Sequence, residues 1–137
     1  MDARLNRVIK ELRGMESSGA ADSLMNRYPP GSERYGDVFE LMRHISWKRP
    51  DQVRLARYYL ARRPFADSKP YEVFASFMAL PRYLNILREV ALHNDRDKEL
   101  FLYHINPILR QLARSDRDRE LIGGFLSEIC LLKQTTH

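Results

Sequence analysis

Apolar residues recur at helical spacing along almost the whole chain. Between residues 2 and 13, leucine, isoleucine and valine occupy positions i, i+3, i+4 and i+7, which places them on one face of a helix. The same spacing, interrupted by proline, glycine and serine, predicts further helices over 37–46, 50–63, 68–80, 81–91, 95–112 and 116–132, with a short helical turn over 20–25. The pattern therefore predicts an all-α fold.

The breaks in this pattern suggest how the chain is organised. Tyr28-Pro29-Pro30-Gly31-Ser32 interrupts helix formation, so residues 26–36 are predicted to form the longest loop. Pro64 ends one helix, and Pro81 favours a break between two others. At 137 residues we expect one domain, with an N-terminal helical segment over 1–25 and a helical core over 37–137.

Two similar phrases in the second half predict two similar helix-turn-helix junctions. Each contains an Asp-Arg-Asp-Lys/Arg-Glu-Leu core, at 95–100 and at 116–121. Asn94 and Ser115 are suitable N-cap residues, and Asp97 and Asp118 follow each of them by three positions. Short turns make neighbouring helices antiparallel, so we expect a compact antiparallel helical bundle of about six to seven helices rather than a repeat stack.

Three features of the last helices carry structural expectations. Pro107 should kink its helix, and the Gly123-Gly124 pair suggests a close helix contact or a bend. Cys130 falls on an apolar helical face and is expected to be a buried thiol. As the only cysteine, it excludes a disulfide or a cysteine-cluster zinc site within one chain.

Charge is distributed unevenly along the sequence. The chain has a net charge of +5, but residues 43–63 contain seven arginine or lysine residues and a single acidic residue, Asp51. On a helix over 50–63, the apolar side chains of Val53, Ala56 and Leu60 are expected to face inward. An arginine stripe is expected on the opposite side, and Tyr83 beside Arg82 could extend this basic and aromatic surface.

This basic segment is the candidate binding site. Guanidinium groups bind phosphate in bidentate fashion, and aromatic rings stack on unpaired bases. The candidate contacts are Arg43, Trp47, Lys48, Arg49, Arg54, Arg57, Tyr58 and Arg62. Nucleic acid, an acidic protein surface, or no partner beyond solvent would each fit this composition.

The expected function is that of a non-catalytic binding protein. Small basic helical bundles of this size occur as accessory subunits of nucleic-acid-handling complexes, and as phage or plasmid regulators. We therefore expect an accessory subunit or regulator that docks on nucleic acid or on a protein complex that handles nucleic acid. A protein-directed inhibitor or adaptor that binds a host enzyme is the first alternative, and its energetics would depend on aromatic anchors such as Trp47.

A second alternative rests on residues 88–93. Arg88-Glu89-Val90-Ala91-Leu92-His93 resembles the Arg-x4-His pattern of the HEPN ribonucleases, a match that covers six residues. This resemblance implies an all-helical, metal-independent RNA-cleaving site formed by two protomers. In such a site His93 would be the general acid or base, and Arg88 would stabilise the phosphorane.

Other site classes receive no support from the sequence. His44, His93, His104 and His137 lack metal-ligand spacing, and no glycine-rich phosphate loop is present. We therefore expect no metal and no cofactor. The basic residues near the start argue against a signal peptide, so a cytoplasmic location without membrane contact is expected, with a homodimer as a possible assembly.

Overall fold

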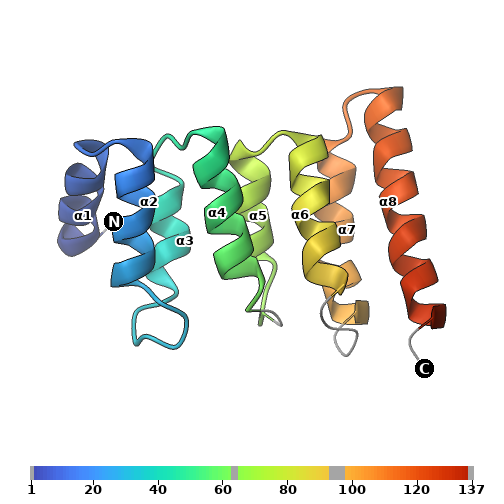
Figure 1. Cartoon of the computed structure of the whole chain (residues 1–137), viewed down its shortest axis with the longest axis horizontal. Coiled ribbons are helices and arrows are strands. Elements are labelled where there is room, and N and C mark those ends of the chain that lie inside the picture. Colours follow the sequence, from blue (N-terminus) through green and yellow to red (C-terminus); the bar gives the residue numbers. More distant parts are fainter. Residues whose placement is uncertain (1, 63–64, 93–97, 136–137) are drawn as a thin grey trace. The chain divides into compact units, whose positions relative to one another are not determined.

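The structure is a computed structural model that describes residues 2–62, 65–92 and 98–135. These residues form eight α-helices and no strand, so the predicted all-α class is confirmed (Figure 1). The chain divides into two compact units, Met1–Arg62 and Arg63–His137, each with the packing of a small helical bundle. The expectation of a single domain stays a prediction.

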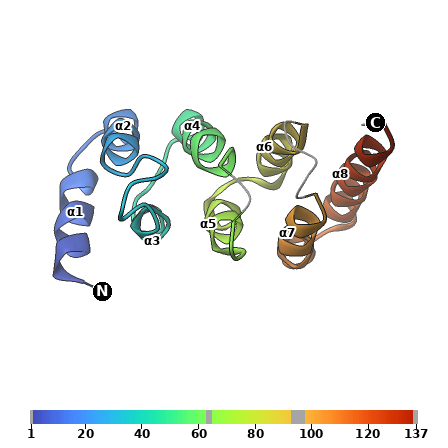
Figure 2. The ribbon, with the colours of Figure 1, turned by 90° about the horizontal axis from the view of Figure 1, so that it is seen from below.

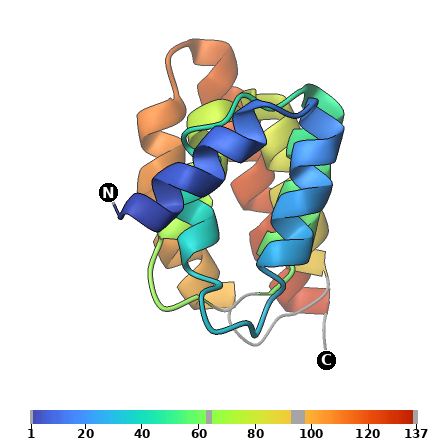
Figure 3. The same ribbon diagram turned by 90° about the vertical axis from the view of Figure 1, so that its left-hand side faces the viewer.

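The first unit contains α1 (Ala3–Arg13), α2 (Ser17–Arg27), α3 (Asp37–Met42) and α4 (Arg49–Leu60). Successive helices run in opposite directions (Figure 1), and the main contacts join α1 to α2, α1 to α3 and α2 to α4. α2 and α4 lie side by side with α1 and α3 beside them (Figure 2), and α1 is inclined to α2 (Figure 3). The α1–α2 and α3–α4 turns consequently lie at the same end of this unit.

Local sequence explains where α1 begins and ends. The Asp2 carboxylate accepts a hydrogen bond from the backbone N–H of Arg4 at 2.7 Å, which caps the first turn. Gly14 ends the helix, and its N–H bonds to carbonyl groups of the last turn. The buried side chains of α1 are Leu5, Ile9 and Leu12, three of the four predicted from the apolar spacing.

The loop after α2 contributes aromatic side chains to the core of the first unit. Tyr28 is buried, and its carbonyl accepts a hydrogen bond from the Tyr59 hydroxyl at 3.0 Å. The Tyr35 ring lies 5.5 Å from the Phe39 ring and 6.0 Å from the Tyr59 ring. Gly31 has a φ of +91°, a conformation that glycine adopts without strain. Tyrosine packing therefore holds this loop against α3 and α4.

The second unit contains α5 (Lys69–Phe77), α6 (Leu80–Leu92), α7 (Lys98–Leu112) and α8 (Asp116–Thr135). Its main contacts join α5 to α6, α5 to α7 and α6 to α8. The helix breaks before Pro81, as predicted, and Pro107 lies inside α7. The Tyr83 hydroxyl is buried and donates to the carbonyl of Tyr71 at 2.8 Å, which ties α6 to α5.

The second predicted junction is present in the described residues. Ser115 precedes α8, and its hydroxyl accepts a hydrogen bond from the N–H of Asp118 at 3.1 Å. The Asp118 carboxylate accepts from the N–H of Arg114 at 3.0 Å, so the two side chains cap the helix together. The corresponding residues of the first junction, Asn94 and Asp97, lie outside the described residues.

Several sequence expectations about individual positions are wrong. Gly123 and Gly124 are exposed, and a Cβ atom at either would meet nothing within 4 Å, so neither mediates a close contact with a described residue, while the alternative of a bend stays a prediction. Cys130 is exposed rather than buried. Tyr83 is buried and adds nothing to a surface. Periodicity places these residues on a helix, but it does not say which helical face has a neighbour.

Candidate nucleic-acid interface

The predicted contact residues lie around α4, but the structure uses them in different ways. Five of the eight side chains are exposed: Arg43, Lys48, Arg49, Arg57 and Arg62. Arg54 and Tyr58 are half-buried, and Trp47 is buried. They therefore do not form one continuous stripe.

Trp47 is part of the interior of the first unit. Its side chain is only 7% exposed, and the indole N–H donates to the carbonyl of Met42 at 3.1 Å. The Trp47 carbonyl in turn accepts from the Gln52 side chain at 3.0 Å, which ties the turn to α4. A ring held in this way cannot stack on a base or insert into a partner, so its contribution is structural.

Arg54 is engaged in contacts within the same unit. Its guanidinium donates to the Asp22 carboxylate at 2.7 Å, to the Asp51 carboxylate at 3.0 Å and to the carbonyl of Ser18 at 3.1 Å. The hydrogen bonds and charges of Asp22 and Asp51 raise the pKa of Arg54. Asp22 and Ser18 belong to α2, so Arg54 holds α4 against α2.

The inward face of α4 differs from the predicted one. Leu55, Ala56, Tyr59 and Leu60 are its buried apolar side chains, whereas Val53 is half-buried. The buried carboxylate of Asp51 shares this face. A tyrosine and an aspartate therefore occupy core positions that the apolar spacing alone did not identify.

Four exposed basic residues gather at one end of the first unit, and we name them the basic end: Arg13, Arg43, Lys48 and Arg49. Arg13 ends α1, and its Nε donates to the carbonyl of His44 at 2.9 Å, just beyond α3. The N–H of Lys48 donates to the Ser17 hydroxyl at 2.9 Å. These two contacts bring the α1–α2 turn and the α3–α4 turn together, and the basic side chains with them.

The electrostatics of the basic end favour an anion. The side chains of Arg43, Lys48 and Arg49 form no ion pair with any described residue. α2 and α4 both begin here without a side-chain cap, so the positive ends of their dipoles add to the same field. In α4, Pro50 has no N–H, and the N–H groups of Asp51 and Gln52 donate to the carbonyl of Lys48. Glu16 is the exposed acidic residue of these two turns.

The acidic residue inside this end is neutralised internally. The Ser17 hydroxyl donates to the Asp51 carboxylate at 2.6 Å, and this hydrogen bond lowers the pKa of Asp51, although burial opposes it. Arg54 lowers the same pKa further. Asp51 therefore carries a compensated charge and subtracts little from the positive field outside.

A cavity of about 420 Å³ lies between the two turns. Its walls include the side chains of Arg13, Met15, Ser17, His44 and Ser46. The Ser17 hydroxyl already donates to Asp51, and the Nε of Arg13 donates to His44. The Nη groups of Arg13 can still hydrogen-bond to phosphate oxygens at such a hollow. Sequence reasoning missed Arg13, because it lies 30 positions before the start of the basic segment at Arg43.

The residues of the ribonuclease alternative have separate surroundings. Arg88 forms a bidentate ion pair with Glu128, with Nε–Oε2 at 2.7 Å and Nη2–Oε1 at 3.2 Å. Its guanidinium also lies 5.6 Å from the centre of the Phe125 ring. Arg88 thus links α6 to α8, while His93 lies outside the described residues.

Comparison with family models of known proteins, with curated proteins and with solved structures gives no match for this chain. Among residues 2–62, 65–92 and 98–135, no helix has the length and apolarity needed to span a bilayer. Within the part of the chain that the structure describes, no group of three His, Cys, Asp or Glu residues could hold a metal ion.

Proposed function

We propose that this protein binds nucleic acid through the basic end of its first unit and acts as a non-catalytic accessory or regulatory subunit. The observation that carries the proposal is the convergence of Arg13, Arg43, Lys48 and Arg49 at two turns joined by hydrogen bonds. None of the four side chains forms an ion pair with a described residue.

The chemistry of this end favours a phosphate backbone over a protein surface. Protein interfaces depend on aromatic anchors that become buried in the partner, and the one tryptophan near this end is already buried in the fold. The remaining groups are cations and backbone N–H donors. Such groups bind phosphate regardless of base sequence, so binding should be strongly dependent on salt.

Fluorescence anisotropy with labelled single-stranded RNA, single-stranded DNA and duplex DNA tests this function. If about four phosphates are contacted, affinity should fall about a hundredfold between roughly 50 and 200 mM salt. The triple variant R43A/K48A/R49A should bind at least about tenfold more weakly at low salt and show a shallower salt dependence.

A matched control removes the same charge from the second unit. The variant R110A/R114A/R117A changes three exposed arginines and should bind as the wild type does. The proposal fails if the wild type does not bind at low salt, or if both triple variants lose affinity equally. Circular dichroism of each variant establishes that its helices are intact.

The same samples test the ribonuclease alternative. A binding protein without catalytic activity should leave the labelled RNA intact after long incubation. Cleavage that disappears in R88A and in H93A, with binding retained, would support the alternative instead.

A further inference from the structure

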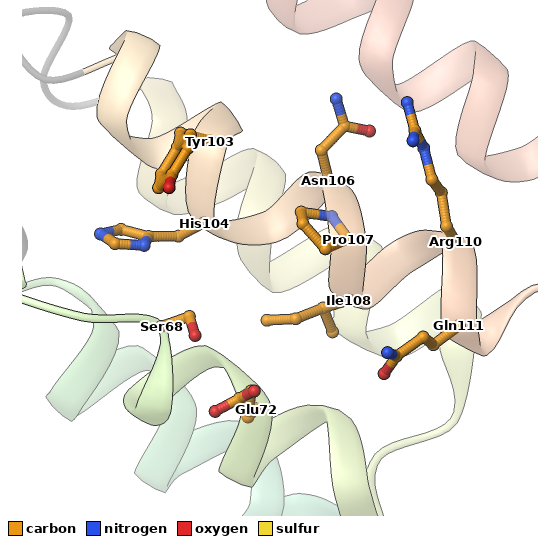
Figure 4. Close-up of a pocket in the computed structure, with 9 residues that line it drawn as sticks. All are labelled: Ser68, Glu72, Tyr103, His104, Asn106, Pro107, Ile108, Arg110 and Gln111. Atoms are coloured by element: carbon orange, nitrogen blue, oxygen red, sulfur yellow. The ribbon is translucent and has the colours of Figure 1, made fainter.

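A second cavity lies within the second unit, between the start of α5 and the middle of α7. Its volume is about 450 Å³, which is in the range of small-ligand sites. Figure 4 shows Ser68 and Glu72 on the α5 side, across the cavity from His104, Ile108 and Gln111 of α7. None of these residues belongs to the basic end.

Two charged residues, Glu72 and Arg110, line this cavity. Glu72 is exposed, and its carboxylate forms no ion pair with a described residue. Arg110 also lines the cavity, but its guanidinium is turned away from α5, as is the Asn106 amide (Figure 4). A ligand between the two helices would therefore meet an uncompensated carboxylate.

Uncharged hydrogen-bond acceptors add to this preference. The Ser68 hydroxyl lies on the same wall as Glu72. Pro107 has no N–H to donate to the carbonyl of Tyr103, so that carbonyl lacks its usual helical partner. In the α7 wall, His104 is 8% exposed, and its Nε2 has no hydrogen-bond partner among the described residues. With the proton on Nδ1, this nitrogen is an acceptor. The cavity thus suits a ligand rich in N–H donors.

Apolar surfaces complete the site. Ile108 and Pro107 present aliphatic groups, and the Tyr103 ring at the rim is 74% exposed, the most exposed large hydrophobic side chain in the described residues. An aliphatic chain can lie against Ile108 and Pro107, while a planar cation can stack on the face of an exposed tyrosine ring.

We propose that the α5–α7 cavity binds an arginine side chain presented by a protein partner. The guanidinium would pair with the Glu72 carboxylate through two parallel N–H···O hydrogen bonds, and its aliphatic stem would lie against Ile108 and Pro107. Arginine fits better than lysine because only its planar fork forms both hydrogen bonds with one carboxylate. The binding is non-covalent, and it is independent of nucleic-acid binding at the basic end.

Nuclear magnetic resonance of the ¹⁵N-labelled full chain tests this site, with Nα-acetyl-arginine N-methylamide as the probe. Saturable shifts are expected at the amides of Ser68, Glu72, His104 and Gln111, with a dissociation constant in the range of about 1–10 mM for so small a ligand. The citrulline analogue has the same shape without the charge and should bind at least about tenfold more weakly.

Two variants and a matched control separate recognition from folding. E72Q keeps the shape and removes the charge, and it should weaken binding of the arginine probe at least about tenfold. Y103A should weaken it by a few-fold through lost contact with the probe at the rim of the cavity. E120Q removes one exposed carboxylate from α8 of the same unit and should leave binding unchanged.

The proposal is overturned if the folded wild type shows no saturable shift at about 20 mM probe. It is also overturned if the citrulline analogue binds equally well, or if E72Q binds as the wild type does. Agmatine, a small amine that carries a guanidinium group, is the last probe. If agmatine binds and the blocked arginine does not, the ligand of this cavity is a small amine and not the side chain of a protein partner. The dispersion of the amide spectrum verifies that each variant is folded.

Discussion

The hydroxyl of Ser17, the first residue of α2, donates to the carboxylate of Asp51 in the first turn of α4 at 2.6 Å. The same oxygen accepts the backbone N–H of Lys48 at 2.9 Å. One side chain thus joins the beginnings of two neighbouring helices, and it fixes the two turns that carry the basic end. The candidate site depends on this contact, although Ser17 itself carries no charge.

Replacing Ser17 by alanine should lower the free energy of unfolding by about 1–3 kcal/mol at neutral pH, because the buried Asp51 carboxylate loses a donor. The folded-state pKa of Asp51 is lowered, so its contribution is full above the unfolded pKa of about 3.9 and is lost as pH falls through the folded pKa. The difference in free energy of unfolding between the wild type and S17A should therefore be smaller in acid.

Urea unfolding at about pH 7 and pH 3 measures this change. S18A is the matched control, because the exposed Ser18 hydroxyl has no such contact and its loss should cost under about 0.5 kcal/mol. An S17A deficit that is equal at both pH values would contradict the role given to Asp51.

Replacing Gly124 or Gly123 by alanine should stabilise the protein by about 0.5–1 kcal/mol each. Both glycines lie inside α8, and a new Cβ would meet nothing within 4 Å. G31A is the opposing control, since the φ of +91° at Gly31 strains any other residue. Thermal unfolding compares the three variants, and a destabilised G124A would mean that this face contacts another molecule.

Replacing Lys98 by methionine should raise the free energy of unfolding by about 1–3 kcal/mol. Lys98 is 4% exposed, and its Nζ has no hydrogen-bond partner among the described residues, so a group of similar shape without the charge removes a desolvation penalty. Thermal and urea unfolding report the change. K10M changes an exposed lysine and should be neutral; a loss of stability in K98M alone would show that the ammonium is compensated in the native protein.

Burial raises the pKa of the Tyr59 phenol in the first unit and of the Tyr83 phenol in the second. A raised folded-state pKa favours the neutral form, so the associated stability is full below the unfolded pKa of about 10 and is lost as pH rises above it. The urea midpoint should fall between about pH 9 and pH 11.

Absorbance near 295 nm should show late ionisation of these two phenols that coincides with the loss of helical circular dichroism. Y59F and Y83F should each remove part of that late step. Reversible ionisation of Tyr59 near its ordinary pKa with helices intact would contradict the burial argument.

Helix positions could be predicted from sequence because most helices have a clear apolar face and proline or glycine at their ends. α2 was the exception and was expected only as a short turn. Its buried residues, Ala20, Ala21 and Leu24, include just one large apolar side chain, so the periodic signal is weak. Packing against α1 and α4 accounts for a helix that local sequence hardly specifies.

The candidate site was predicted less well than the fold, and the reason is long-range pairing. Arg54 and Arg49 have the same chemistry and lie on the same helix, yet Arg54 meets Asp22 across 32 positions of sequence, whereas Arg49 meets no acid among the described residues. The net charge of a segment does not say which of its cations pair with an acidic residue elsewhere in the chain. Arg13 was missed for the same reason, because only the fold brings it to His44.

In each unit, the main partners of a helix lie one or two helices away along the chain. Closing a short loop costs little chain entropy, so contacts between helices close in sequence form readily. Proteins rich in such contacts fold in microseconds to milliseconds. Rapid mixing should therefore find most of the helical signal recovered within the first milliseconds of refolding.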